Sequence, residues 1–545
     1  MNRKKETLLA AIVALACLLV LTMVYSSPFE PVVQPVVDIE KIWAIEDARV
    51  ESDVPLVTEL ENHGAPLAYE RNENTFYCTL GMGNEEAWPD IHLTAQNVRE
   101  GVQLVFVDDY KYDWCADAIR DGYPYQVMAY TDEAFWYFDI VFTSLPIVVL
   151  EADETITAHE DVPVDVSVSW QGEEPLDAFA RAHRRGATSL NKTAKNGFKV
   201  EFTRGETGPR TQADVPFLGA TDEMTLIACS IDPLMIRDRL SWDMYNEFMD
   251  EDEAFGDLDS RYVELFLGED YHGVYLMLKQ YDYAQEMALE EAGAALTDSC
   301  YRTVDGVILN PERPVILDHL GHSYEQHYAP AGEDDFQSLR PYLKMIALED
   351  DAAFSRRVME LMDLDSVIRY ALFIEACGMT DNEFNNLTIW AHHGEDGLEY
   401  RFVPWDLDVS WGLDDGRDAE IWYSFDLFNR MLRLDCGGVV RQRTLEIWQE
   451  LRETAFTQEN MDEFMARYDE ALNGSGAFYR NAVRWEKSHE MLDTYEIYSY
   501  ALSRFDMMDR RIAEIAGEEY KGRQIWVDHY ETRDLGALTA RQMGL

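Results

Sequence analysis

The sequence is poor in basic residues and in cysteine. Of its 545 residues, 46 are Lys or Arg and 103 are Asp or Glu, which gives a formal net charge of −57. A surface this negative repels nucleic acid and anionic lipid, because both are bound largely through neutralised phosphates. We therefore expect no nucleic-acid partner. Apolar residues make up 47% of the chain, enough to bury large cores in several domains.

The seven cysteines are scattered and include no C-x-x-C pair, so a zinc ribbon is not expected. A disulfide between Cys78 and Cys115 stays open, since it depends on the compartment. The sequence also lacks the G-x-S-x-G nucleophile motif, the H-E-x-x-H zinc motif and the Walker phosphate loop. No internal repeat is visible. The usual signatures of hydrolases, zinc proteases and P-loop enzymes are thus excluded.

An uncharged run at residues 7–25 follows Arg3, Lys4 and Lys5. The run is long enough to span a bilayer as a helix, and the basic residues before it predict an N-in, C-out orientation. Residues 1–27 are therefore predicted to be a single-pass membrane anchor, with the bulk of the chain outside the cytoplasm. A cleaved signal peptide, which would give a secreted protein, stays open.

The remaining pattern predicts an α+β protein. Residues 28–65 are interpreted as a stalk with one helix at 38–48, and residues 66–144 as a small β-rich accessory domain. A core domain at 145–430 and its helical C-terminal part at 431–545 follow. The predicted elements are strands at 103–108, 125–130, 135–142 and 198–202, a helix at 233–249, hairpins at 261–278 and 387–403, and a helical bundle at 438–519.

A basic segment at residues 181–210 runs against the overall charge. It holds eight basic and two acidic residues, a net charge of +6. Such a segment suits a polyphosphate ligand: a turn at Arg185-Gly186 with Ser189 offers backbone N–H groups, and Lys195 or Lys199, beside Phe198, is placed to reach phosphate. A solvated basic face that pairs with the acidic remainder of the chain is the open alternative.

Two further motifs carry carboxylates and amides. Asp381 and Asn386 have the D-x-x-x-x-N spacing with which protein kinases place a catalytic Asp and a metal-binding Asn. After a hairpin comes Pro404-Trp-Asp-Leu-Asp408, in which Asp406 suits the kinase metal-binding Asp, because Mg²⁺ takes one or two carboxylates beside phosphate oxygens. The alternative is that these residues cap turns or pair with arginines.

Five blocks, in this order, resemble the CotH (spore-coat protein H) kinase family, an atypical protein kinase type, over roughly residues 145–515. The blocks are Arg185-Gly186 with Ser189, Lys195 and Phe198; Asp232 with Arg237; Val263-Glu264-Leu265 with Tyr271, Gly273 and Tyr275; Asp381–Asn386; and Pro404–Asp408 with Gly412. Lys279 stands near the place where many members have Glu.

The resemblance implies an atypical protein-kinase-like domain that uses ATP and Mg²⁺ to phosphorylate Ser or Thr of a spore-coat or cell-envelope protein. It implies Asp381 as the catalytic residue, and Asn386, Asp406 and Asp408 at the metal. Cofactor binding would fall to Arg185, Ser189, Lys195, Lys199 and Arg237. The open alternatives are a catalytically degenerate structural or adhesive surface protein, a spore-associated location, and transfer to a carbohydrate or small-molecule hydroxyl.

Overall fold

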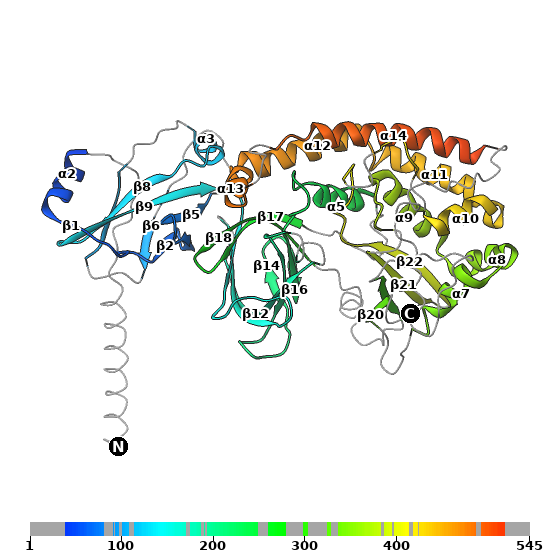
Figure 1. The fold of residues 1–545 in the computed structure, drawn as a ribbon, viewed down its shortest axis with the longest axis horizontal. Coiled ribbons are helices and arrows are strands. Elements are labelled where there is room, and N and C mark those ends of the chain that lie inside the picture. Colours follow the sequence, from blue (N-terminus) through cyan, green and yellow to red (C-terminus); the bar gives the residue numbers. More distant parts are fainter. Residues whose placement is uncertain are drawn as a thin grey trace, which may run out of the picture.

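The computed structural model describes residues 39–80, 91, 93–96, 101–107, 114–170, 175–186, 190, 193–248, 260–279, 298–303, 324–328, 336–382, 386–394, 397–413, 418–422, 425–486 and 492–517. They form a mixed α and β protein in which a β-rich domain, a β-barrel and a mainly helical part follow one another (Figure 1). The predicted anchor at residues 1–27 lies outside the described residues. Within them, no helix has both the length and the apolar character needed to cross a bilayer.

The accessory domain is built on a six-stranded sheet. Its strands are β4 (Ala68–Glu70), β5 (Thr75–Thr79), β9 (Ala134–Thr143), β8 (Tyr125–Tyr130) and β7 (Gln103–Phe106), with β1 (Val50–Glu51) paired to β9. A smaller sheet joins β3 (Ala65–Pro66), β2 (Glu59–Asn62) and β6 (Leu93–Gln96), and α3 (Cys115–Arg120) lies beside β9. The three strands predicted here are confirmed. Cys78 and Cys115 are buried free thiols, and burial raises their pKa to about 12 and about 11.

The described part of the segment interpreted as a stalk packs on this domain. Helix α2 (Ile39–Ala48) buries Ile42 and Ile45 in one cluster with Met128 and Phe135. Strands β1 and β2, which follow it, pair with β9 and β6. Residues 39–62 therefore belong to the accessory domain, because their apolar side chains and backbone groups find partners there.

The middle of the molecule is a closed barrel that the sequence did not predict. Its order is β10 (Ile147–Glu151), β11 (Val162–Ser169), β12 (Leu176–Arg185), β13 (Gly197–Phe202), β16 (Glu223–Ile227), β18 (Asp270–Lys279) and β17 (Ser260–Leu267). Parallel pairing of β10 with β17 closes it. Along β11, buried Val162, Val164 and Val166 alternate with exposed or less buried residues, which is the period of a strand with one face in the core. The strand predicted at 198–202 and the hairpin at 261–278 are confirmed; a short hairpin joins β14 (Ala213–Val215) and β15 (Gly219–Thr221).

The third part packs helices on a four-stranded sheet of order β20 (Tyr324–Tyr328), β19 (Ser299–Thr303), β21 (Leu387–Gly394) and β22 (Gly397–Pro404). The second predicted hairpin is confirmed as β21 and β22, and the C-terminal helices are confirmed too. The helices are α5 (Arg237–Phe248), α7 (Arg340–Leu348), α8 (Asp351–Leu361), α9 (Leu364–Cys377), α10 (Asp426–Leu434), α11 (Val440–Glu453), α12 (Gln458–Asp469), α13 (Ala477–Arg484) and α14 (Tyr495–Ala516), with short turns η3 (Cys436–Gly438) and η4 (Glu470–Gly474).

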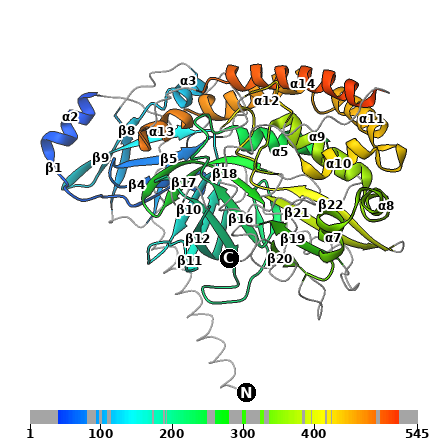
Figure 2. The same cartoon turned by 45° about the vertical axis from the view of Figure 1, so that its right-hand side comes forward.

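A buried network joins all three parts where α13 reaches back over the barrel (Figure 2). Arg480 on α13 donates through Nε and Nη2 to the two carboxylate oxygens of Glu264 on β17, at 2.9 and 3.0 Å. The hydroxyl of Tyr271 donates to the same carboxylate at 2.8 Å, and the Tyr271 N–H donates to Glu70 of the accessory domain. Glu264 is fully buried, so this motif residue serves the packing of the three parts.

Candidate active site

The loop that carries Asp381 begins where helix α9 is forced to stop. Gly378 caps the helix with φ 65°, and a Cβ there would lie 2.2 Å from the hydroxyl oxygen of Tyr500. Any larger residue would be strained by both the backbone and this contact. The chain therefore turns at Gly378 and runs through Asp381 and Asn382 to Asn386, directly before β21.

Hydrogen bonds join this loop to the Pro404–Asp408 loop. The side-chain amide of Asn386 donates to Asp381 at 3.2 Å, and its carbonyl accepts from the Trp405 N–H at 3.0 Å. Buried Asn382 donates to the carbonyl of Trp405 at 2.8 Å. The two motifs that the sequence predicted to cooperate thus meet in space.

Two of the three predicted metal ligands of these loops have left-handed backbones. Asn386 has φ 53° and Asp406 has φ 56°. Such values are uncommon for residues other than glycine, and they persist where the surroundings hold them and a function benefits. The tight turns aim these two side chains from the ends of the hairpin β21–β22.

Five carboxylates gather around the loops; we call Asp232, Asp238, Asp381, Asp406 and Asp408 the carboxylate cluster. Burial, and then the charges of the other four, raise the pKa of Asp408 well above its usual range. Burial and the Asp406 charge raise the pKa of Asp238 to about 7. One oxygen of Asp238 accepts from the Leu407 N–H at 3.3 Å, while its buried Oδ2 has no hydrogen-bond partner.

Asp232 differs from Asp238 and Asp408 because its charge is matched by an arginine. Its oxygens accept from the N–H groups of Leu234, Ile236 and Arg237 at 2.8–3.0 Å, where α5 begins, and it forms an ion pair with the Arg237 guanidinium. A carboxylate at a helix N-terminus satisfies otherwise unpaired N–H groups. This arrangement explains why α5 starts at Arg237 and not at the predicted residue 233.

The oxygen-rich set fits magnesium better than zinc. Among the residues described, no three His, Cys, Asp or Glu side chains are arranged to enclose a metal ion by themselves. Magnesium usually takes only one or two protein carboxylates and completes its shell with water and phosphate oxygens. Asp406, Asp408 and the amide oxygen of Asn386 are donors of this hard kind. The set therefore suits a hard cation such as Mg²⁺.

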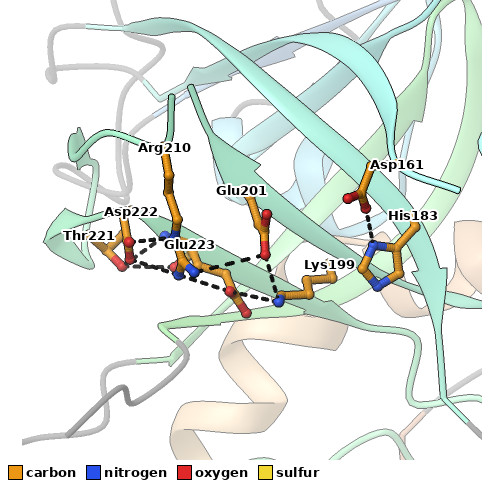
Figure 3. Close-up of polar contacts among 8 residues, drawn as sticks. All are labelled: Asp161, His183, Lys199, Glu201, Arg210, Thr221, Asp222 and Glu223. Atoms are coloured by element: carbon orange, nitrogen blue, oxygen red, sulfur yellow. Dashed lines mark hydrogen bonds and ion pairs between the residues drawn. The ribbon is translucent and has the colours of Figure 1, made fainter. Parts of the chain in front are cut away.

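Two cations of the basic segment, Lys199 and Arg210, pair with acids, whereas Arg181 and Arg184 donate to the Gly208 carbonyl and to Asn196. Figure 3 shows the barrel network, formed by Lys199, Glu201, Arg210, Asp222 and Glu223. Lys199 bridges Glu201 at 2.8 Å and Glu223 at 3.0 Å, and Arg210 donates to Asp222 and Glu223 at 3.0 Å each. The pairing of a strand lysine with a glutamate resembles the Lys–Glu pair of protein kinases, although here Glu223 lies on the neighbouring strand.

The other predicted phosphate ligands differ in setting. Lys195 is 2% exposed; its ammonium donates to the Val274 carbonyl and, at 2.9 Å, to Asn481, and lies 4.4 Å from the Tyr275 ring centre. Arg185 lies over the Trp405 ring at 5.3 Å, and its charge acts on Asp238. Ser189 lies outside the described residues.

Three residues near the site were missed in the sequence: Asp238, Glu223 and Arg302. Asp238 directly follows the motif residue Arg237, so of the three it was the easiest to find from the sequence. Glu223 and Arg302 lie in the short, mostly buried strands β16 and β19, and no motif there indicated a function. A cavity of about 850 Å³ lies away from all of them, lined by residues that include Arg71, Glu151 and Glu269.

The sequence pattern of the family described as CotH kinase protein matches residues 182–514, more than half of the chain. The interval contains the Asp381–Asn386 loop, the Pro404–Asp408 loop and most of the barrel. No curated protein matches the chain. The resemblance seen in the five blocks is thus confirmed: the chain belongs to the CotH kinase protein family.

Proposed function

We propose that this protein is an atypical, kinase-like phosphotransferase that uses ATP and Mg²⁺ to phosphorylate Ser or Thr hydroxyls of a spore-coat or cell-envelope protein. The observation that carries the proposal is the hydrogen-bonded contact between the two motif loops, which sets Asp381 and Asn386 beside Asp406. Family membership supports the same reaction class.

Asp381 is the proposed catalytic residue. Its Oδ2 accepts from the Asn386 amide, which fixes the carboxylate, and the carboxylate would orient an acceptor hydroxyl and take its proton. Asn386, Asp406 and Asp408 would hold magnesium, which when bound neutralises charge on the phosphate oxygens. The rest of the rate enhancement would come from positioning and electrostatics.

We assign the phosphate side of the site to Arg185 and Lys199. Lys199 is held by Glu223, and 25% of its side chain is exposed, whereas Lys195 is almost fully buried against backbone and amide oxygens. Arg237 is engaged by Asp232, and its cofactor role, like that of Ser189, stays a prediction.

The test is transfer of ³²P from ATP to dephosphorylated casein, and to the protein itself. Asp381→Asn and Asp406→Asn should each reduce the rate at least 100-fold without lowering the melting temperature; Asn suits the left-handed backbone at residue 406. Asp506→Asn, an exposed Asp on α14, is the matched control. Undiminished transfer in both site variants would contradict the proposal.

The second candidate is a structural or adhesive surface protein that keeps the fold without transfer. It is favoured by the predicted location outside the cytoplasm, where ATP is scarce; that location stays a prediction. Calorimetric titration separates the two, since only the kinase requires nucleotide binding that depends on Mg²⁺.

A further inference from the structure

Two arginines from different sheets meet on one tryptophan at the edge of the carboxylate cluster. The Arg302 guanidinium lies over the Trp405 ring at 4.6 Å and that of Arg185 at 5.3 Å. Arg185 ends barrel strand β12, Arg302 lies on β19, and Trp405 directly precedes Asp406. Two cations are thus held close together by three distant stretches of chain.

Arg302 makes no hydrogen bond and no ion pair through its side chain within the described chain, and its Nε is buried without an acceptor. Burial first, and then the like charge of Arg185, lower its pKa to about 10, although Glu325, Asp406 and Glu223 act in the opposite direction. Bringing two guanidiniums together costs free energy. A bound anion would lower that cost.

Arg401 in the same sheet shows what a purely structural arginine looks like. It lies over the Trp390 ring at 5.1 Å, a stacking much like that of Arg302. Its guanidinium, however, bridges Asp363 at 3.0 Å and Glu399 at 3.2 Å. Stacking on tryptophan therefore does not require unsatisfied donors, and the open donors of Arg302 need another explanation.

We propose that Arg302, together with Arg185, binds the phosphate chain of the nucleotide. A guanidinium presents planar, paired donors that match phosphate oxygens, and the contact with Trp405 holds the group in place before a ligand binds. The charge of Asp406 acts on Arg302, which places the arginine pair beside the proposed metal ligands. A polyphosphate would then have cationic groups on one side and a carboxylate-held cation on the other. This inference rests on the proposed function.

The experiment is calorimetric titration of the full chain with Mg·ATP, with inorganic triphosphate plus Mg²⁺, and with adenosine. Arg302→Met should weaken binding of Mg·ATP and of triphosphate at least tenfold and leave adenosine unchanged. Arg302→Lys keeps the positive charge and loses the planar set of paired donors. Its affinity for Mg·ATP and triphosphate should lie between those of the wild type and Arg302→Met. Arg401→Met, the matched stacked arginine, should bind all three like the wild type.

Melting curves identify any variant that does not fold, and Arg302→Lys then serves as the test. Wild-type affinity for Mg·ATP in the folded Arg302 variants would overturn the inference and leave the proposed kinase intact. Binding of triphosphate that depends on Arg302, without any binding of ATP, would support the anion site and overturn the kinase. Wild-type protein that binds neither ligand would overturn both.

Discussion

The barrel network and the carboxylate cluster both hold partly or fully buried charges. In the barrel network cations balance the carboxylates, whereas in the carboxylate cluster negative charges lie close to one another. In the barrel network two cations alternate with three carboxylates, and each cation bridges at least two acids. In the carboxylate cluster Asp232 is paired with Arg237, whereas burial and neighbouring like charges raise the pKa of Asp238 and Asp408. Charges matched within the protein stabilise its fold. Unmatched charges of one sign cost stability, and a bound cation would recover it.

The largest loss of stability is expected at the buried Arg480–Glu264 pair, which joins the three parts. As in the barrel network, a cation and a carboxylate match each other here, and this pair is more deeply buried. Arg480→Met would leave Glu264, at 0% exposure, without its cation. Breaking one partner of a buried pair typically costs about 3–5 kcal/mol. Urea unfolding measures this cost.

A double variant, Arg480→Met with Glu264→Gln, controls for the charge left behind and should recover part of the stability. A loss below about 1 kcal/mol in the single variant would show that the network does not join the three parts.

The second-largest expected effect is a gain in stability, in the variant Asp238→Asn. Asp238→Asn removes a buried like charge and keeps an oxygen for the Leu407 N–H. The folded pKa of about 7 lies above the ordinary 3.8, so the protonated form is favoured by folding and stability falls as pH rises from about 4 to about 7. In EDTA at pH 8 the variant should be more stable by roughly 2–3 kcal/mol, and this advantage should vanish near pH 4.

Urea unfolding between pH 4 and pH 8 checks this pH dependence, with Asp506→Asn as the control that should track the wild type. Equal stability of Asp238→Asn and wild type at pH 8 would mean that the cluster carries no unmatched charge. Added Mg²⁺ should narrow the difference, because it binds the wild-type cluster more tightly.

The smallest effect belongs to the barrel network. Glu223→Gln should destabilise by about 1 kcal/mol, since Lys199 keeps Glu201 and Arg210 keeps Asp222. Burial raises the pKa of Glu223 in spite of these two cations, which limits what its charge contributes. If Glu223→Gln were more stable than the wild type in urea unfolding, the charge of Glu223 would be destabilising, like that of Asp238. The two regions would then not differ in how they stabilise charge.

Local patterns predicted much of the fold. Short aromatic and β-branched runs located strands β8 and β9, alternation located β13, and turn residues located both hairpins. Helical periodicity located α5 and the C-terminal bundle. The start of α5 was misplaced because a capping carboxylate, Asp232, decides where the helix begins. The stalk interpretation failed over residues 39–62, because Pro, Val and Glu content does not reveal that Ile42 and Ile45 have a sheet to pack on.

The sequence by itself determined the family, through ordered short motifs, and it predicted Asp381, Asn386 and Asp406 as site residues. Spacing within a loop is a local property, so it can be recognised in the sequence without knowledge of the fold. Only the tertiary structure showed that β10 and β17 pair to close the barrel. It also showed that the charge of Asp406 acts on Asp238 and that Arg302 lies over the Trp405 ring. These contacts join residues far apart in the chain. Their partners are chosen by the packing of whole sheets, which no local pattern encodes.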